Sequence, residues 1–154
     1  MRNGTNAAEY RALAEFRFLI RRYLTNTEKA ARLVGLAPQQ YLCLLALRGL
    51  PRGQEPTIRA LALRLQVRHH SAVELVDRMQ ERKLFRRERS KKDRRHVLIR
   101  MTPRGERLLN RLVRHRIAEL GETGPALVRA LGEVIASGPL RKKPGRRQRA
   151  FNGR

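Results

Sequence analysis

The 154-residue sequence has little of what several protein classes require. Its single cysteine, Cys43, cannot form an internal disulfide and cannot anchor a zinc site alone. The sequence has no run of about 18 apolar residues, so no membrane span is predicted. Its first 20 residues are charged, so no signal peptide is expected there. Serine, histidine and acidic residues are few, and no glycine-rich phosphate loop occurs. We therefore expect no enzyme, no metal site and no cofactor, and a reducing cytoplasm as the setting.

Acidic residues are scarce, whereas basic residues are abundant. Thirteen acidic residues stand against 36 basic ones, a net charge of +23, and 30 of the basic residues are arginine. So many positive charges repel one another in the folded state, and a polyanionic partner would reduce this repulsion. Nucleic acid is the first candidate and an anionic membrane surface the second. Arginine favours bidentate contacts to phosphate and guanine, although a codon bias explains its excess equally well.

Apolar spacing predicts long helices at both ends of the chain. The first is expected over 8–34, ended by Gly35. Thr102 and Pro103 start another helix that breaks at 121–124, and Pro125 opens a last helix that closes at Gly138. The apolar stripes of 8–34 and 103–137 exceed what one small domain can cover, so both are predicted to be dimerisation helices. Residues 139–154 hold seven basic residues and no acid, which predicts a disordered basic tail. That tail could serve as a non-specific DNA arm or only aid solubility.

The middle of the chain predicts a helix-turn-helix. A core helix starts at Pro38 and contains Cys43, which we expect to be buried and inert. Thr57 caps a short helix over 58–65. After the turn Gln66-Val67, a second helix runs over about 68–82, and two helices joined by so short a turn form a helix-turn-helix candidate. The residues of this second helix expected to face inward are Ala72, Leu75, Val76 and Met79.

A β-hairpin is predicted directly after this motif. From Leu84 the pattern alternates, and it resumes with Val97, Ile99 and Met101 on one face and His96, Leu98 and Arg100 on the other. Between Arg86 and Arg104 there are nine basic and two acidic residues. The predicted fold class is therefore mainly α with a small β-hairpin wing. It is a winged helix-turn-helix DNA-binding domain over 36–102, whose second helix enters the major groove while the hairpin tip reaches flanking phosphates or the minor groove.

Three short motifs resemble the MarR family of bacterial transcription regulators: Leu-Val-Asp-Arg at 75–78, Asp-Arg-Arg at 93–95 and Thr-Pro-Arg-Gly at 102–105. The resemblance covers about 8–137. It implies a homodimer, joined by its N- and C-terminal helices, that binds a pseudo-palindromic operator. It also implies that Arg95 enters the minor groove with Asp93 as its orienting partner. Two positions depart from the family. Lys83 stands where the family has glycine, and Arg68 stands where it often has a capping serine.

The resemblance also implies that a small anionic or phenolic effector, or an oxidant, releases the DNA. The family's peroxide sensors carry their cysteine near the start of the chain, where this sequence has none, so thiol sensing is not expected. Family effectors bind between the dimer helices and the winged domain. We expect Arg17, Tyr41 and Arg48 to be the polar groups available to such a pocket. The effector-binding residues are otherwise unknown.

Helix geometry places the candidate DNA contacts. A step of about 100° points His70 and Glu74 outward, with Val73 on one flank. His70 can donate to guanine or phosphate, Glu74 can accept from cytosine N4, and Val73 can pack on a thymine methyl group. Asp77 and Glu81 are expected to pair with Arg78, Arg82 or Arg86. The predicted contact set is Arg68, His69, His70, Ser71, Val73, Glu74, Arg78, Lys91, Lys92, Arg94 and Arg95. The alternatives without a function are that His69 and His70 are ordinary surface histidines and that the basic residues of the hairpin are only solvated surface charges.

The predicted function is sequence-specific binding of double-stranded DNA by a homodimer that regulates transcription. Repression is expected rather than activation. The expected location is the bacterial cytoplasm, in association with the nucleoid. The alternative is a non-specific nucleic-acid packaging or RNA-binding protein, driven by the net charge and the tail. A peripheral membrane protein is a weaker alternative, because the positive charge is not confined to one amphipathic helix face.

Overall fold

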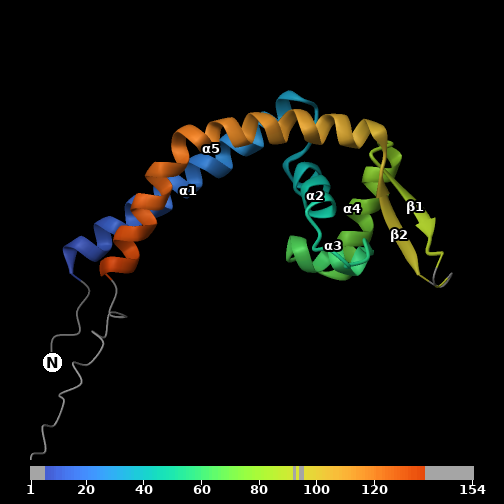
Figure 1. The fold of residues 1–154 in the computed structure, drawn as a ribbon, viewed down its shortest axis with the longest axis horizontal. Coiled ribbons are helices and arrows are strands. Elements are labelled where there is room, and N and C mark those ends of the chain that lie inside the picture. The colour runs from blue at the N-terminus through green and yellow to red at the C-terminus, as the bar shows by residue number, and fades with distance from the viewer. Residues whose placement is uncertain (1–5, 92, 94–95, 138–154) are drawn as a thin grey trace, which may run out of the picture. The chain divides into compact units, whose positions relative to one another are not determined.

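The computed structural model describes residues 6–91, 93 and 96–137 (Figure 1). The chain divides into two compact units. One contains residues up to Tyr23 together with those from Gly121 onward, and the other is Leu24–Leu120. In chain order the elements are α1 (Ala7–Leu33), α2 (Pro38–Arg48), α3 (Ile58–Leu65), α4 (His69–Glu81), β1 (Phe85–Arg89), β2 (Val97–Met101) and α5 (Pro103–Ser137). The predicted class, mainly α with one antiparallel hairpin, is confirmed.

Helix starts follow the local signals in the sequence. Pro38 opens α2, and the Gln40 side chain accepts a hydrogen bond from the Ala37 amide at 3.0 Å. Thr57 caps α3, because its Oγ1 accepts from the Ala60 amide at 3.2 Å. Thr102 caps α5 in the same way, through the Gly105 amide at 3.2 Å. All three predicted starts are confirmed.

The core of the 24–120 unit lies where α2, α3, α4 and the hairpin meet. Its members are apolar and nearly inaccessible: Ala31, Leu36, Tyr41, Cys43, Leu44, Leu61, Leu75, Val76, Met79, Leu84, Phe85, Ile99, Leu109 and Leu112. Burial of Cys43 raises the pKa of its thiol to about 12. The thiolate that oxidants attack is therefore scarce near neutral pH. Cys43 is buried as predicted.

Among the described glycines of this unit, Gly105 has the least room for a side chain. A Cβ atom built on it would lie 2.7 Å from the Leu84 carbonyl oxygen and 2.9 Å from Met101 Cγ. The hydroxyl of Thr102 donates to the Lys83 carbonyl oxygen at 2.7 Å. The start of α5 is therefore fixed against the segment that links α4 to β1.

Within the same unit, α1 and α5 are tied by polar side chains. Asn26 Nδ2 donates to Glu119 Oε1 at 3.0 Å, and the other carboxylate oxygen of Glu119 accepts from Arg116. The Arg116 side chain is almost wholly buried. A buried charge costs much less when it is paired, so Glu119 allows Arg116 to lie inside this contact.

One helix prediction is wrong. The break at 121–124 does not occur, and α5 continues from Pro103 to Ser137 with Pro125 inside it. Leu120 and Leu127 are seven residues apart, two helical turns, so the apolar stripe keeps its phase across the Gly-Pro segment. Proline removes one helical hydrogen bond, and continuation of the helix preserves a single apolar face on both sides of it.

The hairpin also differs from strict alternation. β1 and β2 pair antiparallel with Phe85 opposite Met101 and Arg87 opposite Ile99. Ile99 is buried, and Leu98, predicted on the opposite face with His96 and Arg100, is buried as well. The loop before α3 lies along this part of β2, since the Ile99 amide donates to the Pro56 carbonyl oxygen at 2.7 Å. Leu98 lines a shallow cavity together with residues 53–56, so the second face of β2 is partly covered.

No single helix among residues 6–91, 93 and 96–137 is long and apolar enough to cross a membrane. The bent pair of α1 and α2 meets that test only when the two helices are taken together.

Candidate nucleic-acid interface

The turn between α3 and α4 sets the direction of the second helix. Gln66 caps α3 in the left-handed region, with φ 55°. The Val67 amide donates back to the Ala62 carbonyl oxygen at 3.0 Å, which closes the end of α3. Arg68 is extended, and α4 begins at His69. The helix-turn-helix is therefore present, with three residues between its helices, Gln66, Val67 and Arg68, where two were predicted.

The inner face of α4 is as predicted. Ala72, Leu75, Val76 and Met79 are buried. On the other side His69, His70, Glu74 and Arg78 are exposed, whereas Ser71 and Val73 are half-buried. This face offers hydrogen-bond donors on both sides of one acceptor, Glu74. That mixture suits base edges in a major groove, which present both donors and acceptors.

The α4 N-terminus lacks a side-chain cap. Arg68 occupies the N-cap position with no side-chain cap hydrogen bond, and its side chain is exposed. Arginine has no acceptor atom, so the free amides of the first turn remain available to an anion. Helix N-termini attract phosphate through these amides and the helix dipole.

The wing follows α4 and is drawn at the right of Figure 1. The Ser90 amide donates to the His96 carbonyl oxygen at 2.9 Å, which closes the hairpin beyond β1 and β2. Lys91 and Asp93 are exposed. The predicted contacts Lys92, Arg94 and Arg95 lie outside the described residues, so the pairing of Asp93 with Arg95 stays a prediction.

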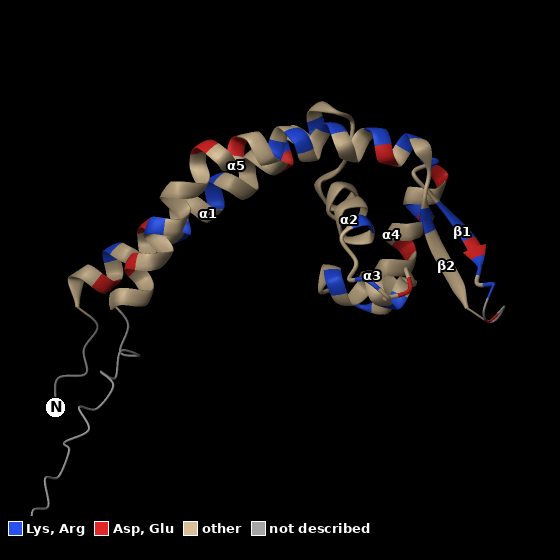
Figure 2. Cartoon of the chain, viewed as in Figure 1, with Lys and Arg blue, Asp and Glu red and all other residues tan. Residues whose placement is uncertain are grey.

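Several wing arginines are paired with acids. Figure 2 shows that basic and acidic residues follow one another along β1. Arg86 Nη2 lies 2.8 Å from Glu88 Oε1, and Arg100 Nε lies 3.2 Å from Glu88 Oε2. These pairs reduce the charge that the strands can offer to phosphates. The remaining basic candidates of the wing cluster around its turn.

The predicted partner of Asp77 is wrong. Asp77 pairs with Arg87, not with Arg78, Arg82 or Arg86, at 2.5 Å between Oδ1 and Nη2. Arg87 Nη1 also donates to Gln80 Oε1 at 2.8 Å. Because Arg87 lies on β1 and its two partners lie on α4, this fork fixes the wing to the helix. No spacing rule joins residues ten positions apart across a helix–strand turn, so the sequence carried no signal for it.

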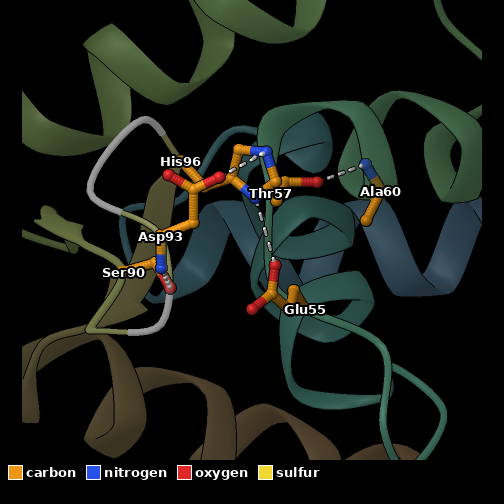
Figure 3. Close-up of polar contacts among 6 residues, drawn as sticks. All are labelled: Glu55, Thr57, Ala60, Ser90, Asp93 and His96. Carbon is orange, nitrogen blue, oxygen red and sulfur yellow. Dashed lines mark hydrogen bonds and ion pairs between the residues drawn. The ribbon is translucent and has the colours of Figure 1, made fainter.

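His96, the last residue of the wing turn, connects the wing to the loop before α3, as Figure 3 shows. Its Nδ1 lies 3.7 Å from Glu55 Oε2, and its Nε2 lies 4.0 Å from Asp93 Oδ2. The Asp93 carbonyl oxygen accepts from the His96 amide at 3.0 Å. Asp93, predicted to orient Arg95, thus also contacts the other end of the wing turn.

The three residues expected near an effector belong to two different units. Arg17 is exposed in the unit that contains residues 6–23, Tyr41 is buried in the core of the other unit, and Arg48 is exposed at the end of α2. Among the described residues, no group of three histidine, cysteine or acidic side chains could hold a metal ion.

Comparison with known proteins agrees with this geometry. Residues 34–96 match the family model described as MarR family. This segment, which holds the helix-turn-helix and most of the wing, is similar to the MarR family. A search of curated proteins gave no significant match.

Solved structures of MarR proteins share the fold over most of the chain. AbsC from Streptomyces coelicolor, titled a MarR family transcriptional regulator, has 21% identity and a TM-score of 0.65, with 79% of this chain and 81% of that one covered. MepR from Staphylococcus aureus, titled a transcription regulator of a multidrug efflux pump, has 16% identity and a TM-score of 0.66, with 79% and 94% covered. BpsR from Bordetella bronchiseptica has 22% identity and a TM-score of 0.58, with 78% and 86% covered. The chain has the fold of a MarR transcriptional regulator.

Proposed function

We propose that this protein binds double-stranded DNA sequence-specifically and regulates transcription as a repressor. The observation that carries the proposal is the exposed face of α4, which presents His70, Glu74 and Arg78 opposite a buried apolar face. A surface helix with a purely structural role needs no such arrangement after a short turn and before a basic hairpin. A point variant of the similar protein MepR is titled as bound to an oligodeoxyribonucleotide, which supports the same use of the fold here.

The remaining contacts are assigned to phosphates. Arg68 and His69 lie at the uncapped start of α4, and Lys91 is exposed on the wing. Phosphate contacts fix the register of a protein on DNA, whereas base contacts carry its sequence preference. Lys92, Arg94 and Arg95 complete the wing contacts of the proposal, and the basic segment 139–154 adds affinity without preference.

The active form is proposed to be a homodimer. Large apolar side chains are exposed along α1 and α5, including Tyr10 at 65%, Phe18 at 57%, Val128 at 71% and Ile135 at 66%. Exposed apolar area on this scale marks an interaction surface, and both helices were expected to join two copies. Sedimentation at micromolar concentration and moderate salt should show a dimer. A monomer under those conditions would contradict the proposal.

The function is tested by selection from random duplex DNA with the full chain. A dimeric regulator should enrich two half-sites related by two-fold symmetry, spaced by about one helical turn or a multiple of it. A packaging protein, the alternative that rests on the charge of +23 and the basic tail, should enrich no sequence. Enrichment of nothing would therefore replace the proposal with that alternative.

A small anionic or phenolic effector is proposed to weaken DNA binding. The support is by similarity only, since BpsR is titled as regulated in DNA binding by 6-hydroxynicotinic acid. Hydroxylated aromatic acids, including 6-hydroxynicotinic acid, should raise the melting temperature of the protein and lower its affinity for DNA. A panel that changes neither quantity would contradict this part of the proposal.

A further inference from the structure

The side chain of Arg82 joins the end of the recognition helix α4 to two other helices. Its Nη1 donates to Gln40 Oε1 at 2.6 Å, and its Nη2 donates to the Gly35 carbonyl oxygen at 2.7 Å. Arg82 is the C-cap of α4. Gly35 follows the last turn of α1, and Gln40 lies in the first turn of α2. One planar guanidinium therefore bridges three helix ends within the unit 24–120.

The acceptors of this fork are themselves fixed. Gln40 is only 8% exposed, and its Oε1 also accepts from the Ala37 amide at 3.0 Å. Gly35 has φ +76°, and its amide donates to the Arg32 carbonyl oxygen at 2.9 Å. Neither acceptor can follow Arg82 if α4 moves, so the two bonds oppose movement of α4 relative to the α1–α2 junction.

Two of the three helix ends at this place favour a cation, whereas the N-terminus of α2 does not. The C-terminal ends of α1 and α4 both lie beside Arg82, and a helix C-terminus carries a partial negative charge. Lysine would supply the charge but not the two parallel donors of the fork. The requirement is thus for arginine specifically.

We propose that Arg82 is a positioning residue for DNA recognition, which holds α4 at the angle to α1 that sequence discrimination requires. The proposal rests on the proposed function. The physical basis of the proposal is the length of the helix: α4 has 13 residues and spans about 20 Å. A small rotation about the Arg82 end therefore displaces His70 and Glu74 at and near the other end. Base contacts depend on such displacements, whereas phosphate attraction hardly does.

The position of α4 can be measured without DNA. Spin labels are attached to cysteines introduced by Lys29→Cys on α1 and His70→Cys on α4, both at exposed positions. Labelled chains are mixed with an excess of unlabelled chains, so that each measured distance lies within one chain. Cys43 is buried and does not compete. Arg82→Ala and Arg82→Lys should broaden the distance distribution between the labels. Gln40→Glu, which keeps both acceptor roles, should leave it unchanged, as should Arg107→Ala, which removes an exposed charge of α5.

The DNA measurement uses unlabelled variants that keep the wild-type fold by circular dichroism. The probes are the sequence selected by the wild-type chain and random duplex DNA. Arg82→Ala should lower the ratio of the two affinities by about tenfold, the cost of one misread base pair. Affinity for random DNA should fall no further than in Arg107→Ala. Arg82→Lys should not restore the ratio.

The outcomes separate the two proposals. If the label distances in Arg82→Ala match those of the wild type, the positioning role is wrong whatever the DNA result. If the distances broaden but the affinity ratio is kept, α4 is held by Arg82 without consequence for recognition, and the proposal is again overturned. If the wild-type chain selects no sequence while Arg82→Ala broadens the distances, the proposed function fails and Arg82 is shown to position α4 alone.

Discussion

Replacing Lys83 by glycine should stabilise the protein. Lys83 has φ +57° in the turn between α4 and β1. Its amide donates to the Gln80 carbonyl oxygen at 2.8 Å, and its carbonyl oxygen accepts from the Thr102 hydroxyl. These bonds hold the residue in the left-handed region, which costs an L-residue with a Cβ atom roughly 1–2 kcal/mol. Glycine removes that cost.

The gain is smaller than the strain, because glycine loses more backbone entropy on folding, about 0.5–1 kcal/mol. The net stabilisation expected for Lys83→Gly is about 0.5–1 kcal/mol, or roughly 1–4 °C in Tm for a domain of this size. Urea unfolding and calorimetry measure it. Lys83→Ala is the matched control, since it removes the same charge and keeps the Cβ atom. Equal stability of Lys83→Gly and Lys83→Ala would refute the reasoning.

Three further predictions concern packing, the wing and the thiol. Gly105→Ala should destabilise by about 2 kcal/mol or more in urea unfolding, because the new Cβ would meet the Leu84 carbonyl oxygen at 2.7 Å, and wild-type stability would contradict that. Arg87→Ala should loosen the wing and leave Asp77 without this partner, seen as faster amide hydrogen exchange in β1; unchanged exchange would show that the fork does not hold the wing. Cys43 should react with a disulfide reagent at pH 8 only as the chain unfolds, since its pKa is raised to about 12, and rapid reaction in the native state would contradict its burial.

Local chemistry explains what the sequence could predict. Thr57 and Thr102 define helix starts by accepting hydrogen bonds from nearby amides, and Pro38 does so through its fixed φ, so each start was correct. Lys83 has a positive φ at the position where the family usually has glycine, so the local conformation agrees with that departure. The inward face of α4 followed from helical period alone. These features depend on residues a few positions apart.

The features that were missed depend on distant residues. The glycines at 121 and 124 and Pro125 are local stop signals, but the phase of the apolar stripe on both sides outweighs them in α5. Asp77 meets Arg87, and Arg82 meets Gln40, only after the helices and the hairpin have packed. Such partners are set by tertiary geometry, and charge counting cannot choose among 30 arginines.

The central claim is that α4 reads bases while the excess charge supplies affinity for any sequence. Its most direct test is the affinity for selected and random DNA, measured across a salt series for the wild type, Glu74→Ala, Arg95→Ala and a chain without residues 139–154. The truncation should weaken both complexes and flatten the salt slope by roughly 0.9 for each phosphate that the shortened chain no longer neutralises. Glu74→Ala should relax preference at one base position by about 1–3 kcal/mol with little change in slope, and Arg95→Ala should fall between. If truncation abolishes the preference while Glu74→Ala and Arg95→Ala keep it, the claim is contradicted.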